Sequence, residues 1–108
     1  MKFRIQVDTI EHPWDMVNRL KGTVADPPMT VMLEYHNKLL AVESALDCHL
    51  CATDEPLHAP YVMNGQVAQR KGHTCIISCG GLLVQLDGVD DCPTFQLQRT
   101  FKVGLTPV

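Results

Sequence analysis

The residues best able to do chemistry in this chain are cysteines and histidines. Cys48 and Cys51 form a CxxC motif, and His73, Cys75 and Cys79 follow downstream. Thiolate and imidazole groups are preferred ligands of Zn²⁺, and paired cysteines also serve in thiol redox chemistry. The sequence therefore suggests either a zinc site or a reactive thiol.

The spacing of these residues limits any metal site to four ligands. His73 and Cys79 lie about 20 Å apart if the segment between them is a strand, so one ion cannot bind both. A second possible set combines the CxxC pair with Cys79 and His58. The favoured set of zinc ligands is Cys48, Cys51, His73 and Cys75.

Two further interpretations of the cysteines compete with zinc. Free cysteine is among the most buried residue types, so these thiols can simply be small hydrophobic core residues. Cys79 precedes two glycines whose N–H groups could stabilise an oxyanion, which would suit a cysteine nucleophile. Redox catalysis is disfavoured because the CxxC pair is expected at a helix C-terminus, where the dipole raises thiol pKa values. Cys92 is expected in a loop, with no assigned role.

Size and composition indicate one globular domain over residues 1–108. The chain is 45% hydrophobic and 19% charged, with a formal charge of −3. It lacks the clustered basic face of a nucleic-acid-binding protein. No apolar run is long enough for a membrane span, and the first residues do not resemble a signal peptide. We therefore expect a cytoplasmic protein without cofactor, nucleic acid or membrane partner.

The first half of the chain is expected to hold a strand and two helices. Residues 3–7 alternate apolar with polar, as in a strand. A short helix is expected from Pro13 to Gly22, with Trp14, Val17 and Leu20 at helical spacing. A long helix is expected over 26–50. Its apolar residues fall on one helical face: Val31, Met32, Tyr35, Leu39, Val42, Leu46 and Leu50.

The long helix has one rival interpretation, and the second half of the chain is expected to consist mainly of strands. The rival to the long helix is a hairpin with strands at 30–35 and 39–42. Asn64-Gly65 predicts a tight hairpin turn. Residues 73–79, 82–86 and 94–105 read as strands, with Phe95 and Arg99 in the inward register of the last. No internal sequence repeat is visible. The predicted fold class is α+β, with a long and a short helix packed on a mainly antiparallel sheet.

Two further groups of residues are candidates for binding. The last strand could be short or bulged, so that Arg99 simply faces solvent. If Arg99 faces inward, its buried guanidinium needs a carboxylate or a ligand anion, and Arg99 is then the first candidate for an acidic ligand, with Tyr35 and Trp14 lining the same pocket. Leu33 and Leu40 lie on the polar side of the predicted long helix. They indicate either a contact with a second subunit or burial by the chain's own strands.

The sequence favours a binding module over an enzyme. It shows no phosphate-binding loop, no paired-carboxylate motif and no HExxH zinc motif. The leading hypothesis is a non-catalytic module that binds a partner protein or small ligand and self-associates, as a dimer, through Leu33 and Leu40 or an unpaired sheet edge. The alternatives are a structural zinc module built on the CxxC motif and a small cysteine enzyme using Cys79.

Overall fold

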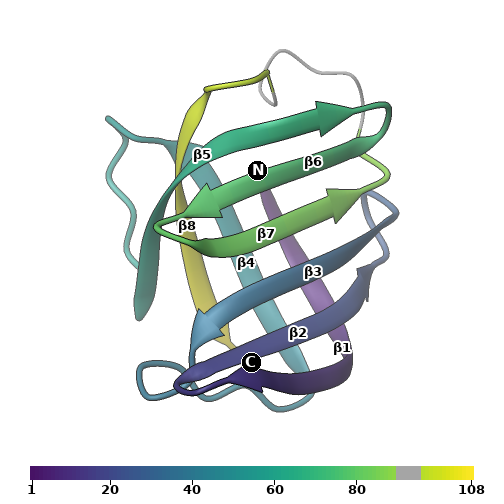
Figure 1. Ribbon diagram of the computed structural model, residues 1–108, viewed down its shortest axis with the longest axis vertical. Helices are drawn as coiled ribbons and strands as arrows, with labels where there is room; N and C mark the ends of the chain where they lie inside the picture. Colours follow the sequence, from purple (N-terminus) through teal and green to yellow (C-terminus); the bar gives the residue numbers. More distant parts are fainter. Residues whose placement is uncertain (90–95) are drawn as a thin grey trace.

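Over the residues that the structure describes, the chain folds into eight antiparallel strands that close into a barrel (Figure 1). The structure, a computed structural model, describes residues 1–89 and 96–108. Within these ranges there is no helix, and therefore none able to span a membrane. The strands are β1 (Lys2–Trp14), β2 (Val17–Val24), β3 (Met29–His36), β4 (Ala45–Ala52), β5 (Tyr61–Lys71), β6 (Thr74–Cys79), β7 (Leu82–Asp87) and β8 (Thr100–Pro107).

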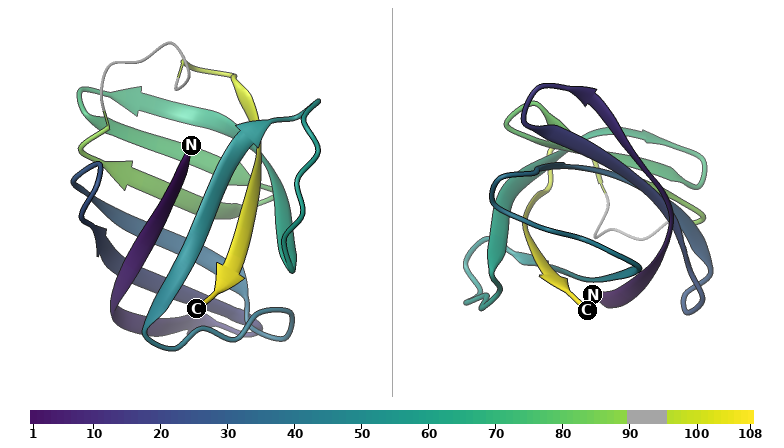
Figure 2. Two further views of the ribbon diagram at one scale, coloured as in Figure 1. Left: turned by 180° about the vertical axis from the view of Figure 1, so that it is seen from behind. Right: turned by 90° about the horizontal axis from the view of Figure 1, so that it is seen from below.

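The strand order around the barrel is β1-β2-β3-β7-β6-β5-β8-β4, with β4 returning to pair with β1. Figure 2 shows β1, β4 and β8 together on the side opposite β6 and β7. Closure gives each strand a neighbour on both sides, which removes the free sheet edges expected to support self-association. The predicted α+β fold is therefore wrong, and the protein is all-β.

The barrel is built from two halves with the same topology. In the first half, β1, β2 and β3 form a meander and β4 returns to pair with β1. In the second half, β5, β6 and β7 form a meander and β8 returns to pair with β5. Each half is thus a four-stranded Greek key, and the halves join through the β3–β7 and β4–β8 pairs.

The registers of the two halves match residue by residue. Gln6 is the last residue of β1 paired with β4 and the first paired with β2. Gln66 has the same position in β5, between β8 and β6. A register shift follows each of them, between Val7 and Thr9 in β1 and between Val67 and Gln69 in β5. The two halves are therefore related by an internal two-fold symmetry that the amino-acid sequence does not reveal.

Core packing shows the same symmetry with large and small residues exchanged. In the first half, Gly22 of β2 leaves room for Ile5 of β1, because a Cβ at Gly22 would lie 2.6 Å from the Ile5 Cγ2 atom. In the second half the glycine is on the first strand. A Cβ at Gly65 would lie 2.5 Å from the Cγ2 atom of Ile77 on β6. Each half fills the same space with one isoleucine and one glycine.

The barrel interior is filled by inward-facing apolar side chains. The apolar core residues alternate along the strands with residues that face outward, as expected for one face of a pleated sheet. The connection between β3 and β4 crosses one end of the barrel (Figure 2), where Leu40 is buried in the core and Val42 packs against it. The lumen is therefore a packed core and not a channel.

The expected long helix over 26–50 is wrong, because this segment contains β3, a loop and β4. Helical spacing arose by chance from two period-two patterns with an irregular loop between them. Leu33 and Leu40, which broke the supposed polar helix face, are only 0% and 5% exposed. The rival hairpin prediction located β3 correctly, but 39–42 is loop and β3 does not pair with β4.

The expected short helix and the expected Asn-Gly turn are also wrong. Trp14 and Val17 are cross-strand partners in the β1–β2 hairpin, which turns at Met16 with a φ of 65°. Gly65 lies inside β5, and its small size serves core packing instead of a turn.

Several strand expectations are confirmed. The structure has strands at residues 3–7, 74–79 and 82–87, and the last strand covers 100–107 with Phe101, Val103 and Leu105 buried. Arg99 precedes that strand and is exposed, so of its two possible positions the solvent-facing one is observed. Cys92 and Phe95 lie outside the described residues.

Candidate functional site

Cys48 and Cys51 lie on opposite faces of β4. Cys48 is opposite Phe3 and Leu105 in the core, whereas Cys51 is opposite Lys102. Because side chains alternate along a strand, residues three apart point in opposite directions. The CxxC spacing would bring two thiols together on a helix but separates them on this strand.

The other two predicted zinc ligands lie elsewhere in the barrel. Cys75 is fully buried on β6, which β8 and β5 separate from β4. His73 lies in the β5–β6 turn, with its Nδ1 atom 3.1 Å from the Val89 carbonyl oxygen. The structure does not bring the four residues together. Within the described part of the chain, no group of three or more His, Cys, Asp and Glu side chains is arranged to hold a metal ion.

Burial makes the core thiols poor nucleophiles. Desolvation, with a smaller contribution from Cys79, raises the pKa of Cys48 to about 12. Desolvation raises the pKa of Cys79 to about 11, and it also raises the pKa of Cys75. Since the thiolate is the reactive form, these cysteines are almost wholly protonated and inert at neutral pH. Cys79 is thus poorly suited to the nucleophilic role considered for it, and Gly80 and Gly81 form the β6–β7 turn beside it.

The three residues proposed to line a ligand pocket are not brought together. Tyr35 is 1% exposed, and its hydroxyl accepts a hydrogen bond from the Asn18 side-chain amide at 3.3 Å. Trp14 lies at the surface near the β1–β2 turn, with its ring centroid 5.7 Å from the Arg19 guanidinium. Arg99 borders a separate hollow of about 230 Å³ that also contains His49.

The predicted contact face is likewise unavailable to a partner. Leu33 points into the core from β3, and Leu40 closes one end of the barrel. Of the two interpretations, burial by the chain's own strands is the one observed.

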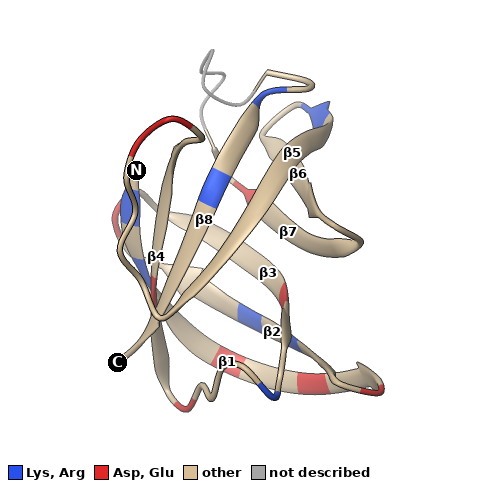
Figure 3. Ribbon diagram, turned by 90° about the vertical axis from the view of Figure 1, so that its left-hand side faces the viewer, with Lys and Arg blue, Asp and Glu red and all other residues tan. Residues whose placement is uncertain are grey.

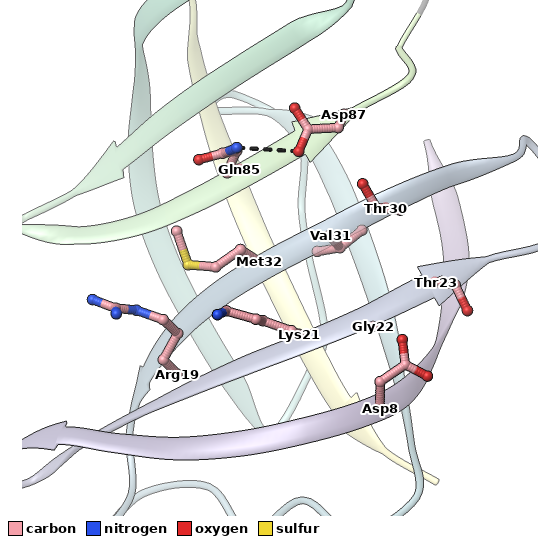
Figure 4. Close-up of a pocket in the computed structure, with 10 residues that line it drawn as sticks. All are labelled: Asp8, Arg19, Lys21, Gly22, Thr23, Thr30, Val31, Met32, Gln85 and Asp87. Carbon is pink, nitrogen blue, oxygen red and sulfur yellow. Dashed lines mark hydrogen bonds between the residues drawn. The ribbon is translucent and has the colours of Figure 1, made fainter.

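An open groove of about 510 Å³ lies on the outer surface of β1, β2, β3 and β7 (Figure 4). It is larger than the hollow at Arg99 and a second one, of about 270 Å³, that also contains His49. Most of the residues that line this outer groove have polar or charged side chains, and the lining comprises Asp8, Arg19, Lys21, Gly22, Thr23, Thr30, Val31, Met32, Gln85 and Asp87.

Strand register arranges the groove side chains in rows. Lys21, Met32 and Gln85 are neighbours across β2, β3 and β7. The next row along the same strands comprises Thr23, Thr30 and Asp87. The internal two-fold axis passes through the Met32–Gln85 pair, because these partners hold equivalent positions in the two halves, opposite Lys21 of β2 and Ile76 of β6. Most of the groove residues belong to the first half, and Gln85 and Asp87 extend the groove across the contact between the two halves.

A buried ion pair lies at one end of the groove. The Glu34 carboxylate is 1% exposed and accepts hydrogen bonds from Arg19 Nε at 3.1 Å and Nη2 at 2.7 Å. Its other oxygen accepts the Leu83 backbone N–H at 2.9 Å. Figure 3 shows the basic positions of β2 between acidic positions on β1 and β3. This carboxylate is fully satisfied by its own chain.

The symmetry-related position in the second half has no cation. Arg19 pairs with Glu34 across β2 and β3, as Thr74 pairs with Asp87 across β6 and β7. Asp87 accepts hydrogen bonds from the Thr74 hydroxyl at 2.6 Å and from the Gln85 amide at 3.1 Å. Both donors are neutral. No Lys, Arg or His among the described residues lies within ion-pair distance of Asp87.

Reasoning from the sequence missed every charged residue of this groove. Arg19, Lys21 and Thr23 alternate with buried residues, which would have placed them on one strand face if a helix had not been assigned there. Comparison of the chain with protein-family models and with curated proteins gives no match. The candidate site is therefore defined by its own geometry.

Proposed function

We propose that this protein is a non-catalytic binding module whose ligand binds in the outer groove. The observation that carries this proposal is the contrast between a lumen filled by apolar side chains and a hollow of about 510 Å³ on the outside that charged and polar side chains help to line. Ligand sites in barrels with open lumens lie inside, but here side chains occupy that space. The outer groove offers both hydrogen-bonding groups and charge.

The state of the thiols supports a role in binding instead of catalysis. Cys48 and Cys79, with pKa values raised to about 12 and 11, supply almost no thiolate at neutral pH. Within the groove, Arg19 is engaged by Glu34, and no histidine or cysteine is among the described residues that line it. The groove thus has groups that recognise a ligand but lacks an activated nucleophile.

Self-association remains part of the proposal, on a different surface from the one first expected. Trp14, Met16 and Leu39 are 50%, 46% and 69% exposed. They belong to adjacent turns, since the Asn37 backbone N–H donates to the Met16 carbonyl at 2.9 Å. An exposed apolar surface of this kind favours contact with a second copy. Light scattering at high protein concentration tests it, and a strictly monomeric protein would remove it.

Selection of ligands with and without a blocked groove tests the binding proposal. Thr30 is exposed at the groove, so Thr30→Trp fills the groove without entering the core. Asn64, exposed on β5, provides the matched control Asn64→Trp away from the groove. Short peptides selected on the wild-type protein should bind the control variant and lose binding to Thr30→Trp. Equal binding to both variants would exclude the groove as the site.

A further inference from the structure

The internal symmetry of the barrel supplies a template for what the groove binds. Arg19 satisfies the Glu34 carboxylate through two guanidinium nitrogens. Asp87 occupies the equivalent cross-strand position in the second half, where Thr74 replaces the arginine. The same carboxylate position thus has an internal cation in one half and none in the other.

Asp87 has capacity for a further donor. A carboxylate offers about four lone-pair sites, and the structure gives one hydrogen bond to each of its oxygens, from Thr74 and Gln85. Asp8 adds a second negative charge to the groove lining and has no ion pair with any described residue. The Asp87 row of the groove is therefore complementary to a cationic group.

Lys21 places a positive charge in the adjacent row of the groove. It forms an ion pair with Glu11 at 3.1 Å, but both side chains are about half exposed. Such surface pairs contribute little, so Lys21 can exchange Glu11 for another carboxylate. Lys21 and Asp87 lie two residues apart along the strand direction, about 7 Å, and on β2 and β7, which β3 separates by about 10 Å across the sheet.

An extended peptide lying over β3 and parallel to it matches this arrangement. Its side chains at i and i+2 share one face and are about 7 Å apart along the strand direction, and long charged side chains can reach β2 on one side and β7 on the other. Thr23, Thr30 and Gln85 can hydrogen-bond a peptide backbone, and Met32 offers an adaptable apolar surface for aliphatic side-chain stems. None of the described groove residues is aromatic, so the groove lacks the stacking surface that bases and sugars use.

Resting on the proposed binding function, we propose that the groove binds an extended polypeptide segment through an arginine and an acidic residue two positions apart. The arginine docks on Asp87 in the manner of Arg19 on Glu34, and the acidic residue pairs with Lys21. Arginine suits this position better than lysine because a planar guanidinium engages a carboxylate through two N–H groups.

Isothermal titration with defined peptides tests the inference on the wild-type protein. The probes are acetyl-Gly-Glu-Ala-Arg-Gly-amide, its reverse-order isomer, and versions in which neutral citrulline replaces arginine or in which the charged residues are adjacent. One of the two i, i+2 orders should bind at least tenfold more tightly than its citrulline and adjacent-charge versions. Equal affinity for citrulline and arginine would overturn the inference.

Variants separate this inference from the binding proposal itself. Asp87→Asn should reduce arginine-peptide affinity at least tenfold, whereas Asp47→Asn, an exposed carboxylate paired with Arg4 on β1, should leave it unchanged. Lys21→Glu should gain affinity for a peptide with arginine at both positions. Methylguanidinium binding as tightly as the peptide would show a small-cation site and overturn the peptide assignment. Absence of binding by all these probes also overturns the inference, while the Thr30→Trp selection decides the binding proposal independently.

Discussion

Glu34 and Asp87 hold equivalent positions in the two halves of the barrel but differ in what satisfies their charge. Glu34 is 1% exposed and bonded to Arg19 of its own half. Asp87 is partly exposed, and Thr74 and Gln85 offer it only neutral donors. The comparison teaches that one cross-strand position can serve stability in one half and leave charge available for binding in the other.

The cores of the two halves differ in a complementary way. Ile5 faces Gly22 in the first half, and Gly65 faces Ile77 in the second. The isoleucine is on the first strand of one half and on the second strand of the other, and the glycine is on the remaining strand. The two halves therefore have the same packing shape with different residues at equivalent positions. The interiors of the two halves are therefore similar in shape, whereas their outer faces differ in charge.

The largest expected effect comes from adding a methyl group to one half. Gly22→Ala should lower the free energy of unfolding by about 3 kcal/mol, because the new Cβ would collide with the Gln6 carbonyl oxygen of the adjoining strand. Gly65→Ala should cost less, about 1–2 kcal/mol, since its Cβ would collide with the side chains of Ile77 and Cys79 but come no closer than van der Waals contact to backbone. Urea denaturation measures both, and an equal cost would contradict the distinction between backbone and side-chain contact.

Removal of the Arg19 guanidinium should have the next largest effect on the free energy of unfolding. Arg19→Ala should cost about 2 kcal/mol, because it leaves the buried Glu34 carboxylate without its charge partner. The arginine is itself 29% exposed, which moderates the loss. Arg4→Ala, which breaks the exposed pair with Asp47, is the matched control and should leave the denaturation midpoint unchanged. Similar losses in both variants would show that the Arg19–Glu34 pair has no special role.

Alkaline pH should lower the free energy of unfolding through the buried thiol of Cys48. Folding raises the pKa of Cys48 from 9.0 to about 12, so below pH 9 the thiol is protonated in both states and its contribution is fully present. Above pH 9 the unfolded thiol loses its proton and the folded thiol keeps it. Stability then falls by about 1.4 kcal/mol per pH unit for this group until the folded pKa is reached. Denaturation of wild type and Cys48→Ala at pH 8 and pH 10 measures the difference, and parallel losses would contradict it.

The smallest expected change in the free energy of unfolding is that of Asp87→Asn, and it distinguishes Asp87 from Glu34. Asp87→Asn keeps a hydrogen-bond acceptor for Thr74 and should change the free energy of unfolding by less than about 1 kcal/mol. Glu34→Gln disrupts a buried charged network and should cost more. Thermal denaturation of both variants checks the order. A larger loss for Asp87→Asn would mean that Asp87 is the structural carboxylate.

Strand content in the second half of the chain was predictable, but the fold class was not. Alternation in 74–79, 82–87 and 100–107 is unambiguous because turn residues bound each run. The segment 26–50 misled because β3, a loop and β4 together mimic a helical repeat. Leu33 contradicted the helix, and strict alternation of Val31, Leu33 and Tyr35 indicated the strand instead.

The candidate site was beyond prediction from the sequence for a related reason. A groove on a closed barrel depends on which strands are neighbours, and β3 pairs with β7 across more than fifty residues of chain. The cysteine motif attracted attention by its spacing alone, yet its chemistry depends on backbone form. On a helix Cys48 and Cys51 share a face, whereas on β4 they do not.

Two methionines allow the most direct test of the central claim, that the ligand binds outside a filled barrel. Met32 lies in the outer groove and Met63 in the core. Protein labelled with ¹³C at the methionine methyl groups can be titrated with acetyl-Gly-Glu-Ala-Arg-Gly-amide or its reverse-order isomer and followed by NMR. The account predicts that the isomer that binds shifts the Met32 resonance saturably and leaves that of Met63 unchanged. A shift of Met63 without Met32 would place the ligand inside the barrel and contradict the account.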